Sequence, residues 1–408
     1  MLRNLESLLD SFLVFPLTLF LLTACALGQS GSVLYSFTGS TAGYGPVGNL
    51  VFDATGNLYG TTLQGGTAGG GGDGVVYELS PATGGGWTET VLHAFSGGSD
   101  GRAPVAGLVF DAAGNLYGTT ESDGTYSRGT VFELSPASGG GWKEKVIYSF
   151  SGGVDGATPT SALVIDAAGN LYGTTIFGGI HSLGTVFELS PNAEGGWDER
   201  VILAGDQAHG GGLNGSVAFD SSGNLYVTAA TGGTQNAGAI YRLRFASGAW
   251  TGAVIYTFQG GVDGGSPSSG LTWRAPNRLF GITNEGGSFG YGTAFELTPS
   301  ARGSWNKAIM HNFGGASDGL PPINSLTLGT SGQLYGTTQL GGGLGGGTAF
   351  ELMETSGVWK ERVLHNFTNR ADAGNPDGGV VLDSSGNLYG EGYYGGASGL
   401  GAVYEIRP

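Results

Sequence analysis

LVFDAAGNLYGTTESDGTYSRGTVFELSP, residues 108–136, is the stretch that decides the fold. Short runs of apolar, β-branched and aromatic residues alternate in it with glycine, asparagine, serine and proline, which is typical of short strands joined by tight turns. Gly114 and Asn115 tolerate the positive φ that such a turn requires. A glycine-rich turn and Trp142 follow the stretch, and we predict four strands in this part of the chain: 108–111, 116–120, 130–134 and 146–150.

The tetrad Asn-Leu-Tyr-Gly of this stretch recurs along the chain at a nearly fixed interval. The tetrad or a close variant begins at seven positions: Asn57, Asn115, Asn170, Asn224, Arg278, Gln333 and Asn387. The six intervals are 58, 55, 54, 54, 55 and 54 residues, close to the roughly 40–50 residues of a propeller blade. We therefore expect an all-β protein, a seven-bladed β-propeller of four-stranded antiparallel blades.

The ends of the chain predict how the ring closes. The third strand of the unit occurs seven times, and its last copy, Ala402–Ile406, is followed only by Arg407 and Pro408. The seventh unit thus lacks its own fourth strand, whereas Val33–Phe37, with the sequence VLYSF, has the fourth-strand pattern and precedes the first complete unit. We expect this N-terminal strand to complete the last blade, because closure removes exposed sheet edges. The predicted single propeller domain spans residues 31–408.

The N-terminus has the features of an export signal. Ser11–Leu22 is an apolar run that is short for a membrane span and is followed by small residues, so we predict a signal peptide over residues 1–28. Cys25 ends the sequence Leu-Thr-Ala-Cys at residues 22–25, which resembles a lipobox whose cysteine is lipidated. The alternative is ordinary cleavage nearby. We expect an exported protein, either extracellular or lipid-anchored in the outer envelope, whose mature chain has no transmembrane segment.

Composition excludes several classes of protein. Glycine contributes 84 of the 408 residues, but aromatic residues make up 11% of the chain, which argues against disorder. The 32 acidic and 16 basic residues give a net charge of −16, which argues against nucleic acid as a partner. Matches to the motif G-x-S-x-G, such as residues 97–101, precede no predicted helix, whereas a nucleophile elbow requires one. We therefore assign no catalytic residue and no cofactor.

Two sets of loops are expected to share one face of the ring. In an antiparallel meander alternate turns point the same way, so the loops between second and third strands lie with the loops that connect blades. The first set carries aromatic residues: Tyr126, Phe177, Phe289, Tyr291, Tyr393 and Tyr394. The second set carries an aspartate four residues before a proline: Asp100, Asp155, Asp263, Asp318 and Asp372. These carboxylates are candidates for binding a cation such as Ca²⁺, although no metal-binding motif supports this; alternatively, each caps its own turn.

Two other repeated positions carry polar groups. A glutamate recurs on the third strand and lines either a channel or the contact between blades: Glu78, Glu133, Glu188, Glu296, Glu351 and Glu405. The fourth unit has Arg242 at this place. A position on the fourth strand alternates between tyrosine and histidine: Tyr35, Tyr148 and Tyr256 against His93, His311 and His365. Such alternation is typical of a packed ring with a polar tip rather than of a metal ligand.

The recurring motifs DxxGNLYGTT, GTVFELSP and SFSGGxDGxxP cover about Val33 to Pro408. They resemble the GloVer repeat of bacterial extracellular proteins, also described as choice-of-anchor tandem-repeat proteins. The resemblance implies export and surface display, and it brings no established activity. We expect a non-catalytic module that binds an extracellular glycan or protein. The alternative is an extracellular propeller enzyme, a lyase or glycoside hydrolase acting on polysaccharide, with His209 and Arg242 of the divergent fourth unit as the residues to mutate.

Overall fold

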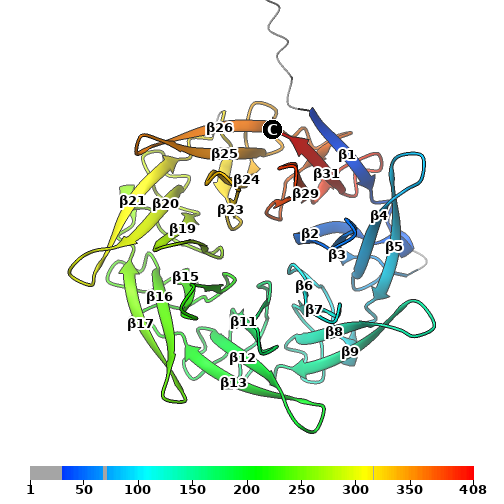
Figure 1. The fold of residues 1–408 in the computed structure, drawn as a ribbon, viewed down its shortest axis with the longest axis horizontal. Coiled ribbons are helices and arrows are strands. Elements are labelled where there is room, and N and C mark those ends of the chain that lie inside the picture. Colours follow the sequence, from blue (N-terminus) through cyan, green and yellow to red (C-terminus); the bar gives the residue numbers. More distant parts are fainter. Residues whose placement is uncertain (1–29, 68–70, 316) are drawn as a thin grey trace, which may run out of the picture.

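Seven antiparallel sheets stand around a central axis in the computed structural model, which describes residues 30–67, 71–315 and 317–408 (Figure 1). The prediction of an all-β, seven-bladed propeller is confirmed. The only helical segments among the described residues are three single turns: η1 (Ser40–Ala42), η2 (Gly98–Asp100) and η3 (Gly261–Asp263). No helix in the described ranges is long and apolar enough to cross a membrane. The predicted signal peptide and Cys25 lie outside these ranges.

Each blade has its first strand near the axis and its fourth strand at the rim (Figure 1). Blades one to three consist of β2 (Tyr44–Phe52), β3 (Leu58–Gln64), β4 (Val75–Pro81), β5 (Trp87–Ala94); β6 (Val109–Phe110), β7 (Leu116–Thr120), β8 (Thr130–Pro136), β9 (Trp142–Ser149); and β10 (Val164–Ile165), β11 (Leu171–Thr175), β12 (Thr185–Pro191), β13 (Trp197–Ala204). Blades four and five consist of β14 (Ala218–Phe219), β15 (Leu225–Ala229), β16 (Ala239–Ala246), β17 (Ala249–Thr257); and β18 (Thr272–Arg274), β19 (Arg278–Thr283), β20 (Thr293–Pro299), β21 (Trp305–Asn312).

The last two blades depart slightly from this plan. In the sixth, two short strands both pair with β24: the sheet contains β22 (Leu320–Pro322), β23 (Thr327–Leu328), β24 (Leu334–Leu340), β25 (Thr348–Thr355) and β26 (Val358–Asn366). The seventh contains β28 (Val381–Leu382), β29 (Leu388–Gly392), β31 (Ala402–Arg407) and β1 (Ser30–Ser36). Beside it, β27 (Ala373–Gly374) pairs with β30 (Tyr394–Gly395).

The ring closes by pairing the two ends of the chain, as predicted. β1 runs antiparallel to β31, with Val33 opposite Tyr404 and Ser36 opposite Ala402, and Figure 1 shows the blue strand beside the red one. Phe37 follows β1; its amide donates a hydrogen bond of 3.0 Å to the Gly401 carbonyl, and its ring is fully buried. The strand begins three residues earlier than the predicted Val33–Phe37.

The fourth strands also begin earlier than predicted. In the second blade β9 starts at Trp142, which pairs with Pro136, rather than at Val146. The added residues include Lys143, Glu144 and Lys145, and exposed and half-buried positions alternate along them. This strand is the rim of the blade and has one face in solvent, so its charged residues hide the strand signal that a buried strand would give.

The core lies between neighbouring blades. Tyr59 of the first blade packs edge-on against Trp142 of the second, with 6.2 Å between ring centroids, and Phe95 packs against Phe132 at 5.1 Å. These residues belong to one buried cluster, and equivalent clusters recur around the ring. At Gly118 of the tetrad this packing leaves no room for a side chain: a Cβ added there would lie 2.5 Å from the Phe132 ring.

Candidate functional site

Loops from two sets do share one face of the ring. The loop that enters the second blade forms an isolated bridge with the loop between its second and third strands, Arg102 to Ser122, and the third blade repeats this with Ala157 and Phe177. We call this surface the loop face; it consists of the loops between second and third strands together with the loops that connect blades. The predicted aspartates and aromatic residues all lie on it.

The five aspartates of the loop face are turn caps in the structure. Asp155 is the most buried, with 7% of its surface exposed, and it accepts hydrogen bonds from the Ser151 amide at 2.7 Å and from Tyr148 Oη at 3.1 Å. Each of the five accepts a hydrogen bond from the backbone amide four residues earlier. That bond is 3.0 Å or shorter for Asp100, Asp155, Asp263 and Asp318, and 3.1 Å for Asp372. Their carboxylates are therefore engaged locally.

The position that alternates tyrosine with histidine supplies the second partner of these carboxylates. His93 Nε2 lies 3.1 Å from Asp100 Oδ1, and His311 Nε2 lies 2.9 Å from Asp318 Oδ2. Burial alone would raise the pKa of Asp100, but the hydrogen bonds from His93 and from the Ser96 amide outweigh it and lower that pKa. The predicted packed ring with a polar tip describes these side chains.

The aromatic residues of the loop face project into solvent. Phe289 is 62% exposed and Tyr126 is 58% exposed, and the other exposed members are Phe177, Tyr291 and Tyr394. Tyr393 is half-buried and packs edge-on against Tyr394, with 4.7 Å between centroids. The rings come from four different blades, so they form separate aromatic sites around the face. These rings are open to solvent and free to contact a ligand.

The glutamates of the third strand lie between blades. Glu188 accepts a hydrogen bond of 3.0 Å from Trp250 Nε1 of the next blade and pairs with Arg200. In the seventh blade Glu405 accepts a hydrogen bond of 3.0 Å from Tyr389 Oη. Of the two alternatives from the sequence, these contacts support hydrogen bonding between and within blades, not a lined channel.

The fourth unit shows no convergence of its two divergent polar residues. His209 Nδ1 lies 2.9 Å from Asp206 Oδ2 in an exposed loop. Arg242 is paired across the sheet with Tyr226, whose pKa is raised by burial and by Asp220 while Arg242 opposes that rise. The two side chains thus have separate partners on separate parts of the blade.

A small polar cavity of about 100 Å³ is lined by equivalent residues of all seven blades, among them Asn49, Ser161, Ser269 and Asp377. These residues lie within or just before the innermost strands of their blades, so the cavity lies on the axis. Asp377 is the one carboxylate in its lining; burial raises its pKa, and Gln339 Nε2 donates a hydrogen bond of 3.1 Å to it.

The clearest break in the repeat is at the seam between the seventh and first blades, at a residue that is not among the predicted site residues. Glu391 stands where the tetrad is usually followed by threonine, and it is fully buried. Tyr77 Oη donates a hydrogen bond to Glu391 Oε1, while Glu391 Oε2 and Tyr404 Oη have no hydrogen-bond partner among the described residues. Burial raises the pKa of Glu391 well above its usual value. The carboxyl is sealed from solvent, so a dissolved substrate does not reach it.

A family model described as the Gloeobacter/Verrucomicrobia repeat matches residues 18–208 and 212–408. No curated protein sequence is significantly similar to the chain. Among solved structures, virginiamycin B lyase from Staphylococcus aureus superposes with a TM-score of 0.55 at 13% identity, over 93% of this chain and 99% of the lyase.

Two other solved structures are similar to a lesser degree. A 6-phosphogluconolactonase candidate from Bacteroides uniformis gives a TM-score of 0.51 at 14% identity, over 77% of this chain and 84% of that one. A protein of unknown function from Dyadobacter fermentans gives 0.46 at 11% identity, over 92% and 96%. At these identities the similarity to the lyase and to the lactonase candidate shows the fold alone.

Proposed function

This chain belongs to the Gloeobacter/Verrucomicrobia repeat family, and from that premise we propose that it is an exported, non-catalytic binding module whose loop face holds a neutral extracellular glycan. One observation carries the proposal. Of the fourteen exposed large apolar side chains among the described residues, nine lie on the loop face, and five of these are aromatic. Exposed aromatic rings gathered on one surface are characteristic of binding surfaces.

The distribution of the rings favours a polymer over a compact protein partner. Protein interfaces concentrate their anchoring residues in a central cluster, whereas Tyr126, Phe177 and Phe289 stand in different blades. A polysaccharide offers the same sugar unit repeatedly, and several weak contacts to one polymer give a higher overall affinity than any single contact. The net charge of −16 disfavours an anionic polymer, and the loop aspartates already accept hydrogen bonds from their own turns, so we expect a neutral glycan.

Affinity electrophoresis through gels that contain a soluble β-glucan, xylan or mannan tests this function. We expect at least one of these polymers to retard the protein, and Tyr126→Ala, Phe177→Ala and Phe289→Ala each to weaken the retardation. Phe245→Ala is the matched control, because Phe245 is 50% exposed but lies at the end of β16, on the opposite face. Equal weakening by the control variant, or no retardation in any gel, would contradict the proposal.

The enzyme alternative has less support from the geometry. Acid–base catalysis requires groups that converge where a substrate reaches them. His209 and Arg242 have separate partners, and Glu391 is fully buried. Assay of new reducing ends or unsaturated products with the same three polymers tests this alternative; turnover that is lost in Arg242→Ala would favour it over a binding module.

Export is part of the proposal and rests on the apolar N-terminal segment and on Cys25. Expressed in a bacterium with lipoprotein processing, the protein is expected in the envelope or the medium. Cys25→Ser separates the two anchoring alternatives: release from the membrane fraction supports lipidation, and an unchanged distribution supports simple cleavage. Retention of the full chain in the cytoplasm would contradict export.

A further inference from the structure

Neighbouring blades meet at their rims through three repeated positions, which we call the outer junction. The first is the tyrosine or histidine of a fourth strand, and the second is the loop aspartate seven residues later. The third belongs to the fourth strand of the next blade, two residues after its tryptophan. Different junctions of the ring hold different side chains at these positions, although the local backbone geometry is the same.

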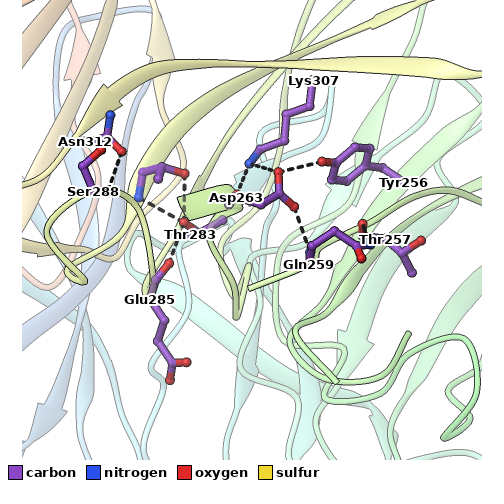
Figure 2. Close-up of polar contacts among 10 residues, drawn as sticks. Tyr256, Thr257, Gln259, Asp263, Thr283, Glu285, Ser288, Lys307 and Asn312 are labelled. Atoms are coloured by element: carbon purple, nitrogen blue, oxygen red, sulfur yellow. Dashed lines mark hydrogen bonds and ion pairs between the residues drawn. The ribbon is translucent and has the colours of Figure 1, made fainter. Parts of the chain in front are cut away.

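At the junction of blades four and five a buried cation occupies the third position. Lys307 Nζ lies 3.1 Å from Asp263 Oδ1 and also donates to the Asp263 backbone carbonyl, while Tyr256 Oη donates to the same carboxylate at 2.8 Å (Figure 2). The Lys307 side chain is only 4% exposed. The ammonium group therefore lies beside the loop carboxylate and neutralises it within the junction.

At the junction of blades one and two a second carboxylate stands in that place. Glu144 is the equivalent of Lys307, and it faces Asp100 and His93. One ligand atom from each of these three residues lies within 4.8 Å of the other two, and this is the one such group among the described residues. Glu144 Oε1 is excluded from solvent and has no hydrogen-bond partner there. Two carboxylates thus share this site, whereas the equivalent place at the junction of blades four and five holds a cation.

The electrostatics of this arrangement favour a bound positive charge. Two like charges in a partly desolvated site repel each other, and either a proton or a cation relieves the repulsion. An open hollow of about 440 Å³ is lined by both Asp100 and Glu144, so the pair is accessible to an ion from solvent.

We propose that His93, Asp100 and Glu144 form a binding site for a divalent metal ion of the Zn²⁺ or Mn²⁺ kind. One imidazole nitrogen and two carboxylate oxygens suit these ions, whereas Ca²⁺ takes six to eight oxygen ligands. Bonds of about 2.1 Å place two ligands of a tetrahedral ion roughly 3.4 Å apart, which small side-chain rotations reach from the present spacing. The ion occupies the place of the Lys307 ammonium and joins the first blade to the second.

Calorimetric titration of the purified, untagged full chain with ZnCl₂, MnCl₂ and CaCl₂, after removal of metals with chelator, tests the site. His93→Tyr and Glu144→Lys are the informative variants, because the chain itself uses tyrosine and lysine at the equivalent positions 256 and 307. Their folding is checked by circular dichroism. Glu199→Gln is the matched control, since Glu199 holds the third position at the next junction, where Tyr148 replaces the histidine.

We expect the wild-type chain to bind Zn²⁺ or Mn²⁺ with an affinity that falls at least about 10-fold in both variants and is unchanged in Glu199→Gln. Zn²⁺ or Mn²⁺ should also raise the melting temperature of the wild type but not of Glu144→Lys, whose ammonium group replaces the ion. Failure of both ions to bind, or binding that is equal in the wild type and in Glu144→Lys, would overturn the proposal. Ca²⁺ binding of equal affinity that survives His93→Tyr would also overturn it.

Discussion

Phe37→Ala removes the largest side chain that the closing segment places in the core. The Phe37 ring is 0% exposed and makes edge-on contacts with Tyr35 and Tyr77, each with 5.1 Å between centroids. Tyr77 lies in the first blade, so the ring of Phe37 joins the N-terminal segment of the seventh blade to its neighbour. The substitution therefore tests whether the closing segment is packed as firmly as a segment within the chain.

The expected loss follows from burial. Replacing a fully buried phenylalanine by alanine costs about 3–5 kcal/mol, from lost transfer free energy and from the cavity that remains. The two edge-on contacts contribute roughly 0.5–1.5 kcal/mol each to such a total. We expect the free energy of unfolding to fall by about 4 kcal/mol, measured by urea denaturation with tryptophan fluorescence and followed as a shift of the midpoint.

Phe150 provides the matched control. It is also 0% exposed, its amide donates a 3.0 Å hydrogen bond to Gly129, and its ring contacts Tyr148 and Phe187 edge-on. Phe150 has the same place in the second blade, whose chain is continuous, so Phe150→Ala and Phe37→Ala should lose similar amounts. If the free energy of unfolding of Phe37→Ala lies within about 0.5 kcal/mol of the wild-type value while Phe150→Ala shows a large loss, the packed closure is refuted.

Three further predictions concern charged and buried polar groups. Asp155→Ala should lower the free energy of unfolding by about 1–3 kcal/mol in thermal or urea unfolding, because it leaves the Ser151 amide and Tyr148 hydroxyl without their acceptor; an unchanged stability would favour a ligand-binding role instead. Burial and the charge of Asp155 raise the folded pKa of Glu199 to about 7 from 4.5, so this group should cost stability as the pH rises from 4.5 to 7. Because Glu199 is partly exposed, we expect this group to make the protein only about 1 kcal/mol less stable at pH 8 than at pH 5. Glu199→Gln should remove this difference in melting curves. If the variant keeps the full wild-type difference between the two pH values, the assignment is contradicted. Glu391→Thr should lower the free energy of unfolding by about 1–3 kcal/mol, because it leaves the Tyr77 hydroxyl without its acceptor. In a double-mutant cycle, adding Tyr77→Phe should restore most of that loss. Strictly additive effects of the two substitutions would rule out the coupling.

The ring and its closure could be predicted from the sequence because both follow from a repeated sequence pattern. The spacing of the Asn-Leu-Tyr-Gly tetrad gives seven units, and the fourth-strand pattern of Val33–Phe37 supplies the missing strand. The rims of the blades were harder to predict. Residues such as Lys143 and Glu144 belong to strands with one face in solvent, where side-chain polarity does not distinguish a strand from a loop.

The outer junctions and the seam could not be predicted, although their residues are visible in the sequence. Asp100 and Glu144 belong to different units, and only the packing of one blade on the next brings them together. Glu391 stands out as a glutamate in place of threonine, but its partner Tyr77 is 314 residues away and is reached only across the closed ring. A repeat reveals equivalent positions; it does not reveal which positions of neighbouring repeats touch.

Hydroxyl-radical footprinting with and without the neutral polysaccharide that retards the protein most is the most direct test of the binding face. The oxidation rates of exposed rings report their accessibility to solvent. We predict protection of Tyr126, Phe177 and Phe289 on the loop face, and an unchanged rate for Phe245, which is 50% exposed on the opposite face. Protection of Phe245 with unchanged rates on the loop face would contradict the account.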